Sequence, residues 1–174
     1  MSHFYATLPK ELQDLSLHEA IRLYENGPAK IQDAITGLSH EQLNSFPIPG
    51  TWSIQQIVVH LLDSDILASV RMKRVIAEND PTLELYDESA FARKLGYDRM
   101  DLDLVMDLFV QNRRLNASIL RLLQPAEFDR TGLHPEFGPI TLRQLLNAYI
   151  FHVDHHLSFI KKKRELVVAT PSAS

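Results

Sequence analysis

Apolar residues recur at helical spacing in four long stretches of the chain, separated by short segments rich in glycine and proline. Within each stretch they follow one another at intervals of three or four, which favours amphipathic helices. The pattern predicts helices over about residues 16–38, 53–78, 101–123 and 141–164. No alternating pattern is strong enough to indicate a strand. We therefore expect an all-α protein built as a four-helix bundle.

Residues typical of helix ends sharpen these boundaries. The tripeptide Asn26-Gly27-Pro28 interrupts the first stretch and predicts either two helices or one kinked helix. Ser53 followed by Gln56 fits a capping box at the start of the second helix, and Thr141 is expected to cap the fourth. In the third helix, the apolar stripe predicted to face the core consists of Leu104, Val105, Leu108, Leu115, Ile119 and Leu122.

The segments outside these helices are less regular. Residues 81–99 predict a long connection, of the kind that crosses over a bundle or lines a site. Residues 131–139 contain two glycines and two prolines, which indicates a loop or a short irregular hairpin. The basic run at 161–164 is interpreted as the solvated last turn of the fourth helix, and residues 167–174 as a tail. The length suits one domain, residues 1–174, with its core at about 16–165.

Composition narrows the class of protein. Hydrophobic residues make up 45% of the chain and charged residues 23%, which is typical of a globular protein rather than a disordered one. The net charge of -4 argues against a general nucleic-acid binder, because phosphate binding needs a basic face. No secretory signal and no membrane-spanning apolar run is visible. We expect a soluble, cytoplasmic protein that binds neither nucleic acid nor membrane.

The chain contains eight histidines and no cysteine. The absence of cysteine excludes a disulfide scaffold, a Cys-based zinc finger, an iron–sulfur cluster and a cysteine nucleophile. Any metal ion must therefore be held by histidines and carboxylates.

Helical spacing brings three of the histidines to inward faces. His152 and His156 are four residues apart and share one face of the fourth helix, while His60 lies on the apolar face of the second. The segment 152–156, reading HVDHH, lacks the glutamate that follows the first histidine in the metalloprotease pattern HExxH. His155 is offset by about 60° from His152, beside the shared face.

Two interpretations of these histidines stand side by side. A single buried histidine is more often a core residue with one satisfied hydrogen bond. Burying three imidazoles without partners costs on the order of 1–3 kcal/mol each, and a shared divalent cation would offset that cost. Three neutral ligands leave a coordination position open, as in catalytic zinc sites.

Other polar residues near these faces have weaker assignments. Asp63 is expected either to orient a ring, accept a proton or act as a fourth ligand, or else to be a solvated carboxylate at the edge of the stripe. Trp52 is interpreted as a hydrophobic plug beside the cap of the second helix. The remaining histidines have no partner at ligand spacing and are assigned to surface or loops: His3, His18, His40 and His134.

Three segments together resemble a known family. They are residues 52–63 (WSIQQIVVHLLD), 138–146 (GPITLRQLL) and 152–156 (HVDHH). In order and spacing they resemble the DinB-like superfamily, and within it the YfiT-type candidate metal-dependent hydrolases, which include bacillithiol transferases. The resemblance implies an up-down-down-up bundle that forms a homodimer. It also implies metal ligation by His60, His152 and His156, with His155 outside the ligand set, around a divalent ion such as nickel or zinc.

The resemblance favours thiol transfer as the reaction. A low-molecular-weight thiol, acting as cosubstrate, would bind the ion as thiolate and attack an electrophilic small molecule, with Asp63 or His155 handling protons. The first alternative is hydrolysis by metal-bound hydroxide, which the missing glutamate beside a metal histidine disfavours. The second is a non-enzymatic helical module that binds metal or merely retains structural histidines.

Overall fold

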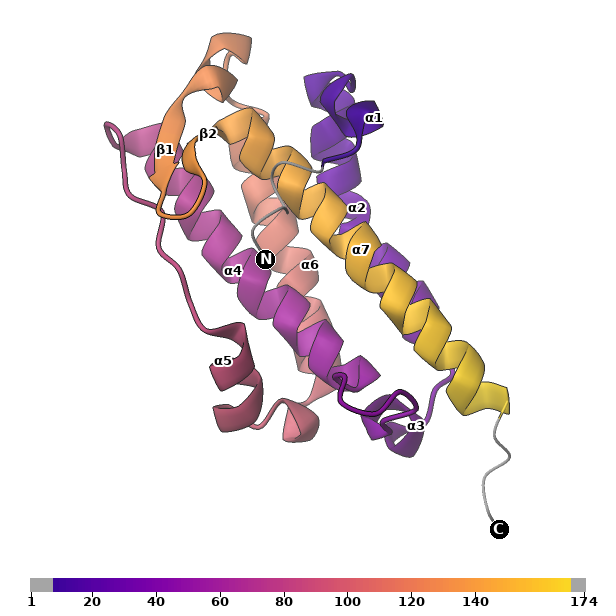
Figure 1. The fold of residues 1–174 in the computed structure, drawn as a ribbon. Coiled ribbons are helices and arrows are strands. Elements are labelled where there is room, and N and C mark those ends of the chain that lie inside the picture. Colours follow the sequence, from indigo (N-terminus) through magenta and orange to yellow (C-terminus); the bar gives the residue numbers. More distant parts are fainter. Residues whose placement is uncertain (1–7, 170–174) are drawn as a thin grey trace.

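The computed structural model describes residues 8–169, which form four long helices lying side by side (Figure 1). These are α2 (Leu17–Ile35), α4 (Ile54–Ala77), α6 (Leu102–Leu120) and α7 (Leu142–Ala169). The shorter helices and turns are α1 (Lys10–Gln13), α3 (His40–Asn44), α5 (Glu88–Lys94), η1 (Tyr97–Arg99) and η2 (Pro125–Asp129). Strands β1 (Thr131–His134) and β2 (Gly138–Thr141) form one hairpin. The prediction of a four-helix bundle is confirmed.

Contacts along the bundle establish the direction of each helix. Arg143, near the start of α7, donates to the carbonyl of Leu15, just before α2. Arg164, near the end of α7, donates to the carbonyl of Ala34 at the end of α2, so these two helices run parallel. Each of them runs antiparallel to its neighbour from the other pair, as the pairing of Arg121 with Glu25 shows for α6 and α2.

Helices α4 and α6 form the second parallel pair. Asp65 pairs with Arg113 at 2.9 Å, and one turn further along both helices Ser69 contacts Asn116. The chain therefore goes up in α2, down in α4 and α6, and up in α7. This topology sets α4 and α7 side by side and antiparallel, so side chains from distant parts of the sequence meet between them.

Both helices that carry the inward histidines begin with a capping box. The Ser53 hydroxyl accepts from the backbone N–H of Gln56 at 3.1 Å, and the Gln56 side chain accepts from the N–H of Ser53 at 3.0 Å. Thr141 and Gln144 make the same two bonds at the start of α7. The predicted caps are confirmed, and they fix where the helical repeat of each histidine face begins.

The Gly27-Pro28 pair lies inside α2 without ending it, so the first predicted stretch is one helix. Pro28 has no N–H to donate to the carbonyl of Tyr24. That carbonyl instead accepts from Nη1 of Arg113 at 2.8 Å. A Cβ at position 27 would lie 2.3 Å from the same nitrogen, so glycine provides the space for the guanidinium.

The predicted core face of α6 is wrong for most of its apolar residues. Leu104, Leu108, Leu115 and Leu122 are between 49% and 80% exposed, Ile119 is partly buried, and only Val105 faces the core as expected. The buried face carries Val105, Met106, Phe109, Arg113, Asn116, Ala117 and Leu120. Its polar members bond Asp65 and Ser69 of α4, so a buried polar network decides which side of α6 faces inward.

The basic run near the end of α7 differs from its prediction. The helix continues to Ala169, so the run is not its last turn, and residues 170–174 of the predicted tail lie outside the described part. Lys163 is 3% exposed and donates to Thr51 at 2.5 Å. Arg164 donates to the carbonyls of Ala34 and Thr36 and so caps the end of α2. Only the other two lysines of the run are solvated.

Two irregular segments lie against the outer side of α4. The hairpin confirms one of the two forms predicted for residues 131–139. Its first strand exchanges backbone bonds with residues 81–83, where Leu83 and Leu133 are linked at 2.8 Å. From there the chain runs along α4 to α5, at the other end of the same helix (Figure 1). Within residues 8–169, every helix is too short or too polar to cross a membrane.

Candidate metal centre

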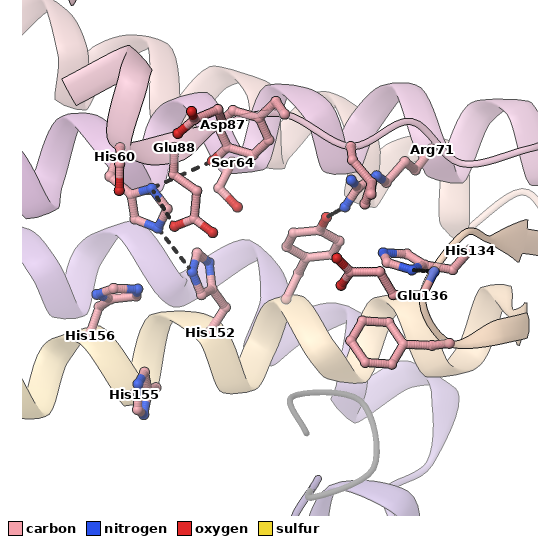
Figure 2. Close-up of a pocket in the computed structure, with 15 residues that line it drawn as sticks. His60, Ser64, Arg71, Asp87, Glu88, His134, Glu136, His152, His155 and His156 are labelled. Atoms are coloured by element: carbon pink, nitrogen blue, oxygen red, sulfur yellow. Dashed lines mark hydrogen bonds and ion pairs between the residues drawn. The ribbon is translucent and has the colours of Figure 1, made fainter. Parts of the chain in front are cut away.

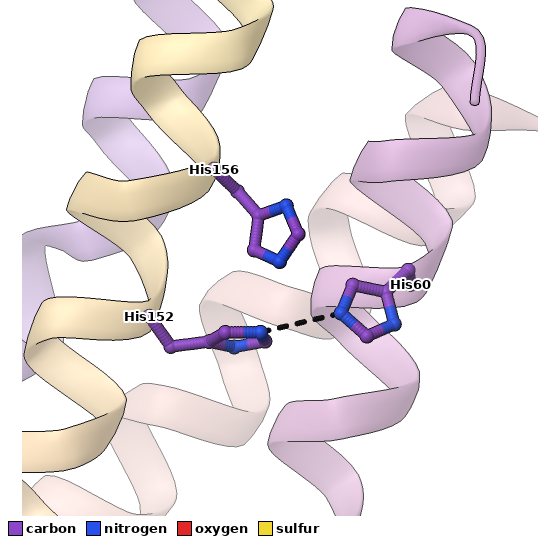
Figure 3. A group of neighbouring side chains, drawn as sticks. All are labelled: His60, His152 and His156. Carbon is purple, nitrogen blue, oxygen red and sulfur yellow. Dashed lines mark hydrogen bonds between the residues drawn. The ribbon is translucent and has the colours of Figure 1, made fainter. Parts of the chain in front are cut away.

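The structure brings three predicted histidines together between α4 and α7 (Figure 3). One nitrogen from each of His60, His152 and His156 lies within 4.8 Å of the others. The Nε2 atoms of His60 and His152 are 3.2 Å apart, and the ring centroids of His152 and His156 are 4.6 Å apart. The antiparallel pairing of the two helices produces this convergence, because it places one turn of α4 opposite two successive turns of α7.

The donor set fits a divalent cation. A zinc–imidazole bond of about 2.0–2.1 Å in tetrahedral geometry places two ligand nitrogens about 3.3 Å apart. The 3.2 Å between His60 and His152 matches that spacing, and small ring rotations would bring in His156. In addition, the buried Nδ1 atom of His156 has no hydrogen-bond partner among residues 8–169. An ion would also relieve the pair of Nε2 atoms, of which only one can donate without it.

Burial keeps all three imidazoles neutral. It lowers the pKa of His60 to about 4 and that of His156 to about 3. The pKa of His152 is also well below its usual value, first because of burial and then because of the neighbouring His156. A metal ligand must offer an unprotonated nitrogen, so at neutral pH the cluster is already in its binding form.

The single tryptophan packs against the cluster. Trp52 lies just before the cap of α4, and its ring centroid is 4.9 Å from that of His60 at an angle of 53°. The half-buried indole therefore does plug this end of the bundle as expected, and it does so directly on a candidate metal ligand.

A carboxylate that the sequence did not single out lies beside His60. Oε2 of Glu88, at the start of α5, is 3.7 Å from Nδ1 of His60, and the hydroxyl of Tyr86 is 3.5 Å from the same atom. Burial raises the pKa of the Glu88 carboxyl. The prediction that residues 81–99 line a site is thus confirmed, but its only signal in the sequence was the length of the connection.

The two predicted proton carriers lie further from the cluster. The carboxylate of Asp63 accepts from the hydroxyl of Tyr97 at 2.5 Å, and Asp63 is not among the residues that line the cavity. Burial raises its pKa. His155 is exposed at the cavity rim, with its ring 5.5 Å from that of His156 and 4.8 Å from that of Phe159. The structure therefore groups neither residue with the three inward imidazoles.

A cavity of about 480 Å³ extends from the histidine cluster toward the hairpin (Figure 2). Its size is within the range of small-molecule sites. His134 lines its far end and is 3% exposed, so its assignment to the surface is wrong: β1 turns it inward. His18 and His40 are exposed as predicted, and His3 lies outside the described residues.

Comparisons with known proteins agree with this fold and site. A sequence model of the DinB superfamily matches residues 23–160. A candidate metal-dependent hydrolase from Oceanobacillus iheyensis is 31% identical over 150 residues, covering 86% of this chain and 87% of that protein. YfiT from Bacillus subtilis, also named as a candidate metal-dependent hydrolase, is 30% identical over 141 residues, covering 80% and 79%.

Two solved structures share the architecture. The structure of YfiT, described as a probable metal-dependent hydrolase with an unusual four-helix bundle topology, matches with a TM-score of 0.82 at 28% identity. It covers 87% of this chain and 89% of that one. A mycothiol-dependent maleylpyruvate isomerase matches with a TM-score of 0.67 over 84% of this chain and 61% of that one. At 14% identity, that second likeness shows the fold alone.

Proposed function

This chain belongs to the DinB superfamily, and from that premise we propose that it is a metal-dependent hydrolase of small molecules. Its ion would be held by His60, His152 and His156. The observation that carries the proposal is the convergence of three neutral imidazoles on one point at the wall of a cavity. Three protein ligands leave a coordination position open on the cavity side, which is the arrangement of catalytic rather than structural sites.

The cluster and its surroundings divide the work. When bound, a divalent ion there supplies Lewis acidity and lowers the pKa of a coordinated water. Trp52 packs on the His60 ring and holds its orientation from one side. Tyr86 and Glu88 face Nδ1 of the same ring, so its Nε2 atom is left to face His152 and the ion.

Glu88 is the proposed proton acceptor. Hydrolysis needs a base near the attacking water, and no glutamate follows a metal histidine in this sequence. Glu88 supplies that carboxylate from a different segment, beside His60 and on the lining of the cavity. Burial raises its pKa toward neutrality, which strengthens it as a base. The objection that the sequence raised against hydrolysis is thereby removed.

Thiol transfer remains a second candidate, favoured by one observation. The three imidazoles are neutral and contribute no negative charge to offset that of an ion. An anionic fourth ligand such as a thiolate suits such a site, and with no cysteine in the chain the thiol would have to come from a cosubstrate. Zinc or nickel as the ion, assembly as a homodimer and a cytoplasmic location are further parts of the proposal.

Metal binding is tested first, by the fluorescence of Trp52. Chelator-treated protein titrated with Zn²⁺, Ni²⁺ or Co²⁺ is expected to show a saturable change at one equivalent, because the indole lies on a ligand ring. His60→Ala should abolish the change, whereas His18→Ala, an exposed histidine on α2, should preserve it. A stoichiometry well below one that His60→Ala leaves unaltered would refute the metal centre and favour the non-enzymatic alternative.

The reaction is tested separately. Loaded protein is incubated with a panel of chromogenic esters and amides, with and without a low-molecular-weight thiol. Turnover that does not depend on thiol supports hydrolysis. Turnover that requires thiol, and consumes it in equal amount, contradicts hydrolysis and supports transfer.

A further inference from the structure

At the hairpin end of the cavity, away from the histidine cluster, two nitrogen-bearing side chains line the wall. They are Arg71 of α4 and His134 of β1 (Figure 2). Both are buried, at 8% and 3% exposure. This end contributes nothing to the proposed metal centre, so its chemistry needs a separate explanation.

Arg71 is fixed in position by two oxygen acceptors. Its Nε atom donates to the carbonyl of Glu84 at 3.0 Å, and its Nη2 atom donates to the same oxygen. Its Nη1 atom donates to the hydroxyl of Tyr149 at 2.9 Å. These acceptors are neutral, so they orient the guanidinium plane without bringing negative charge to it. A preorganised guanidinium is well suited to bind a planar carboxylate.

His134 is held in one tautomer. The backbone N–H of Glu136 donates to its Nδ1 atom at 3.2 Å, so in the neutral ring the proton is on Nε2. The imidazole therefore presents a neutral donor on the side away from the hairpin turn. Arg71 and His134 together offer one charged and one neutral donor to the same end of the cavity.

The middle of the cavity is largely apolar. The ring of Tyr149, whose hydroxyl meets Arg71, has its centroid 6.3 Å from that of His152. One aromatic residue thus spans the distance between the metal-facing and the arginine-facing ends. Leu85 and Phe137 add apolar lining.

We propose that Arg71 and His134 form a subsite for a carboxylate, so that the cavity takes an elongated organic acid with an apolar middle. The carboxylate would lie at the hairpin end and the scissile bond at the histidine cluster. The carboxylate of Glu88, beside His60, repels an anion from the opposite end and so sets one orientation. This inference rests on the proposed function, because it names the substrate class of the same cavity.

The test is binding of two matched probes, 4-phenylbutyrate and 4-phenylbutyramide, to chelator-treated full-length protein, measured by calorimetry or ligand-observed NMR. Removing the ion ensures that the carboxylate cannot bind a metal instead. The acid is expected to bind about tenfold more tightly than the amide, as for one charge-assisted hydrogen bond. Arg71→Met and Arg71→Gln should bind both probes equally, with melting temperatures showing that each variant is folded.

Arg74→Met is the matched control, since Arg74 lies three residues along α4 and pairs with Glu78 outside the cavity. It should keep the tenfold preference. Equal affinity for the two probes in the unmodified protein, a preference that survives in both Arg71 variants, or no binding of either probe overturns the subsite. An acid preference that depends on Arg71, in a protein that binds no metal, would uphold the subsite and refute the hydrolase.

Discussion

Replacing Gly27 by alanine is expected to destabilise the protein, against the usual rule for helices. In an exposed helix interior, Gly→Ala stabilises by about 1 kcal/mol. Here a Cβ would lie 2.3 Å from Nη1 of Arg113 and 3.3 Å from its Cζ. Either the guanidinium moves, or α2 moves away from it.

The contacts of Arg113 set the magnitude. Its Nε atom bonds Asp65 at 2.9 Å, Nη1 bonds the carbonyl of Tyr24 at 2.8 Å, and Nη2 bonds that of Tyr149 at 3.0 Å. Losing the Nη1 bond costs about 1.5–3 kcal/mol, and no backbone N–H replaces it because residue 28 is proline. Disturbing the buried pair with Asp65 adds to that cost, since breaking such a pair outright costs about 3–5 kcal/mol. After the gain in helix propensity, we expect a net loss of about 2 kcal/mol.

Urea unfolding followed by circular dichroism measures this directly. Asn26→Ala, at the exposed neighbouring position of the same helix, is the control and should change stability by less than about 0.5 kcal/mol. A Gly27→Ala protein that is more stable by about 1 kcal/mol would show that Arg113 does not need the space. The reasoning about the Gly27-Pro28 pair would then be wrong.

Three further predictions concern the site and the fold. Glu88→Gln should lower the hydrolytic rate by about 10²–10⁴-fold while leaving the Trp52 metal titration nearly unchanged, whereas Glu136→Gln should leave the rate unchanged; equal rates for Glu88→Gln and the parent would exclude Glu88 as the base. Chelator-treated protein should lose stability as the pH falls below about 6.5, because the unfolded histidines then take up protons that folded His60 and His156, with pKa values of about 4 and about 3, do not. Urea unfolding at pH 7.5 and pH 5 checks this, and His60→Gln should be less acid-sensitive; identical stability at both pH values would contradict the burial of neutral imidazoles. Arg164→Ala should cost about 1–3 kcal/mol by uncapping α2, against little change for Lys162→Ala, as thermal unfolding would show.

The features that the sequence predicted well are those set by short-range geometry. Capping boxes involve residues three apart, and a shared helix face involves residues three or four apart. Ser53 and Thr141 could therefore be placed at helix starts, and His152 and His156 on one face, without knowledge of the tertiary fold. His60 joined them because an apolar helix face must point into the bundle.

The features that the sequence missed depend on contacts between distant segments. Glu88 reaches His60 from an irregular connection that has no period to read. His134 is buried because the hairpin folds back over α4, which its local Gly and Pro content does not reveal. The exposed leucines of α6 were assigned inward because an apolar stripe was assumed to mark the core, whereas Arg113 and Asn116 occupy that face.

That polar face of α6 also explains how the histidine cluster is positioned. Through one side chain, Arg113 bonds the backbone of α2 at Tyr24, the carboxylate of Asp65 on α4 and the backbone of α7 at Tyr149. Asp65 lies just over one turn beyond His60, and Tyr149 lies just under one turn before His152. Apolar packing alone tolerates sliding of one helix along another, but three directional bonds to one guanidinium do not. The register of α4 against α7, and with it the 3.2 Å between His60 and His152, therefore follows from a buried arginine that the hydrophobic pattern placed on no face at all.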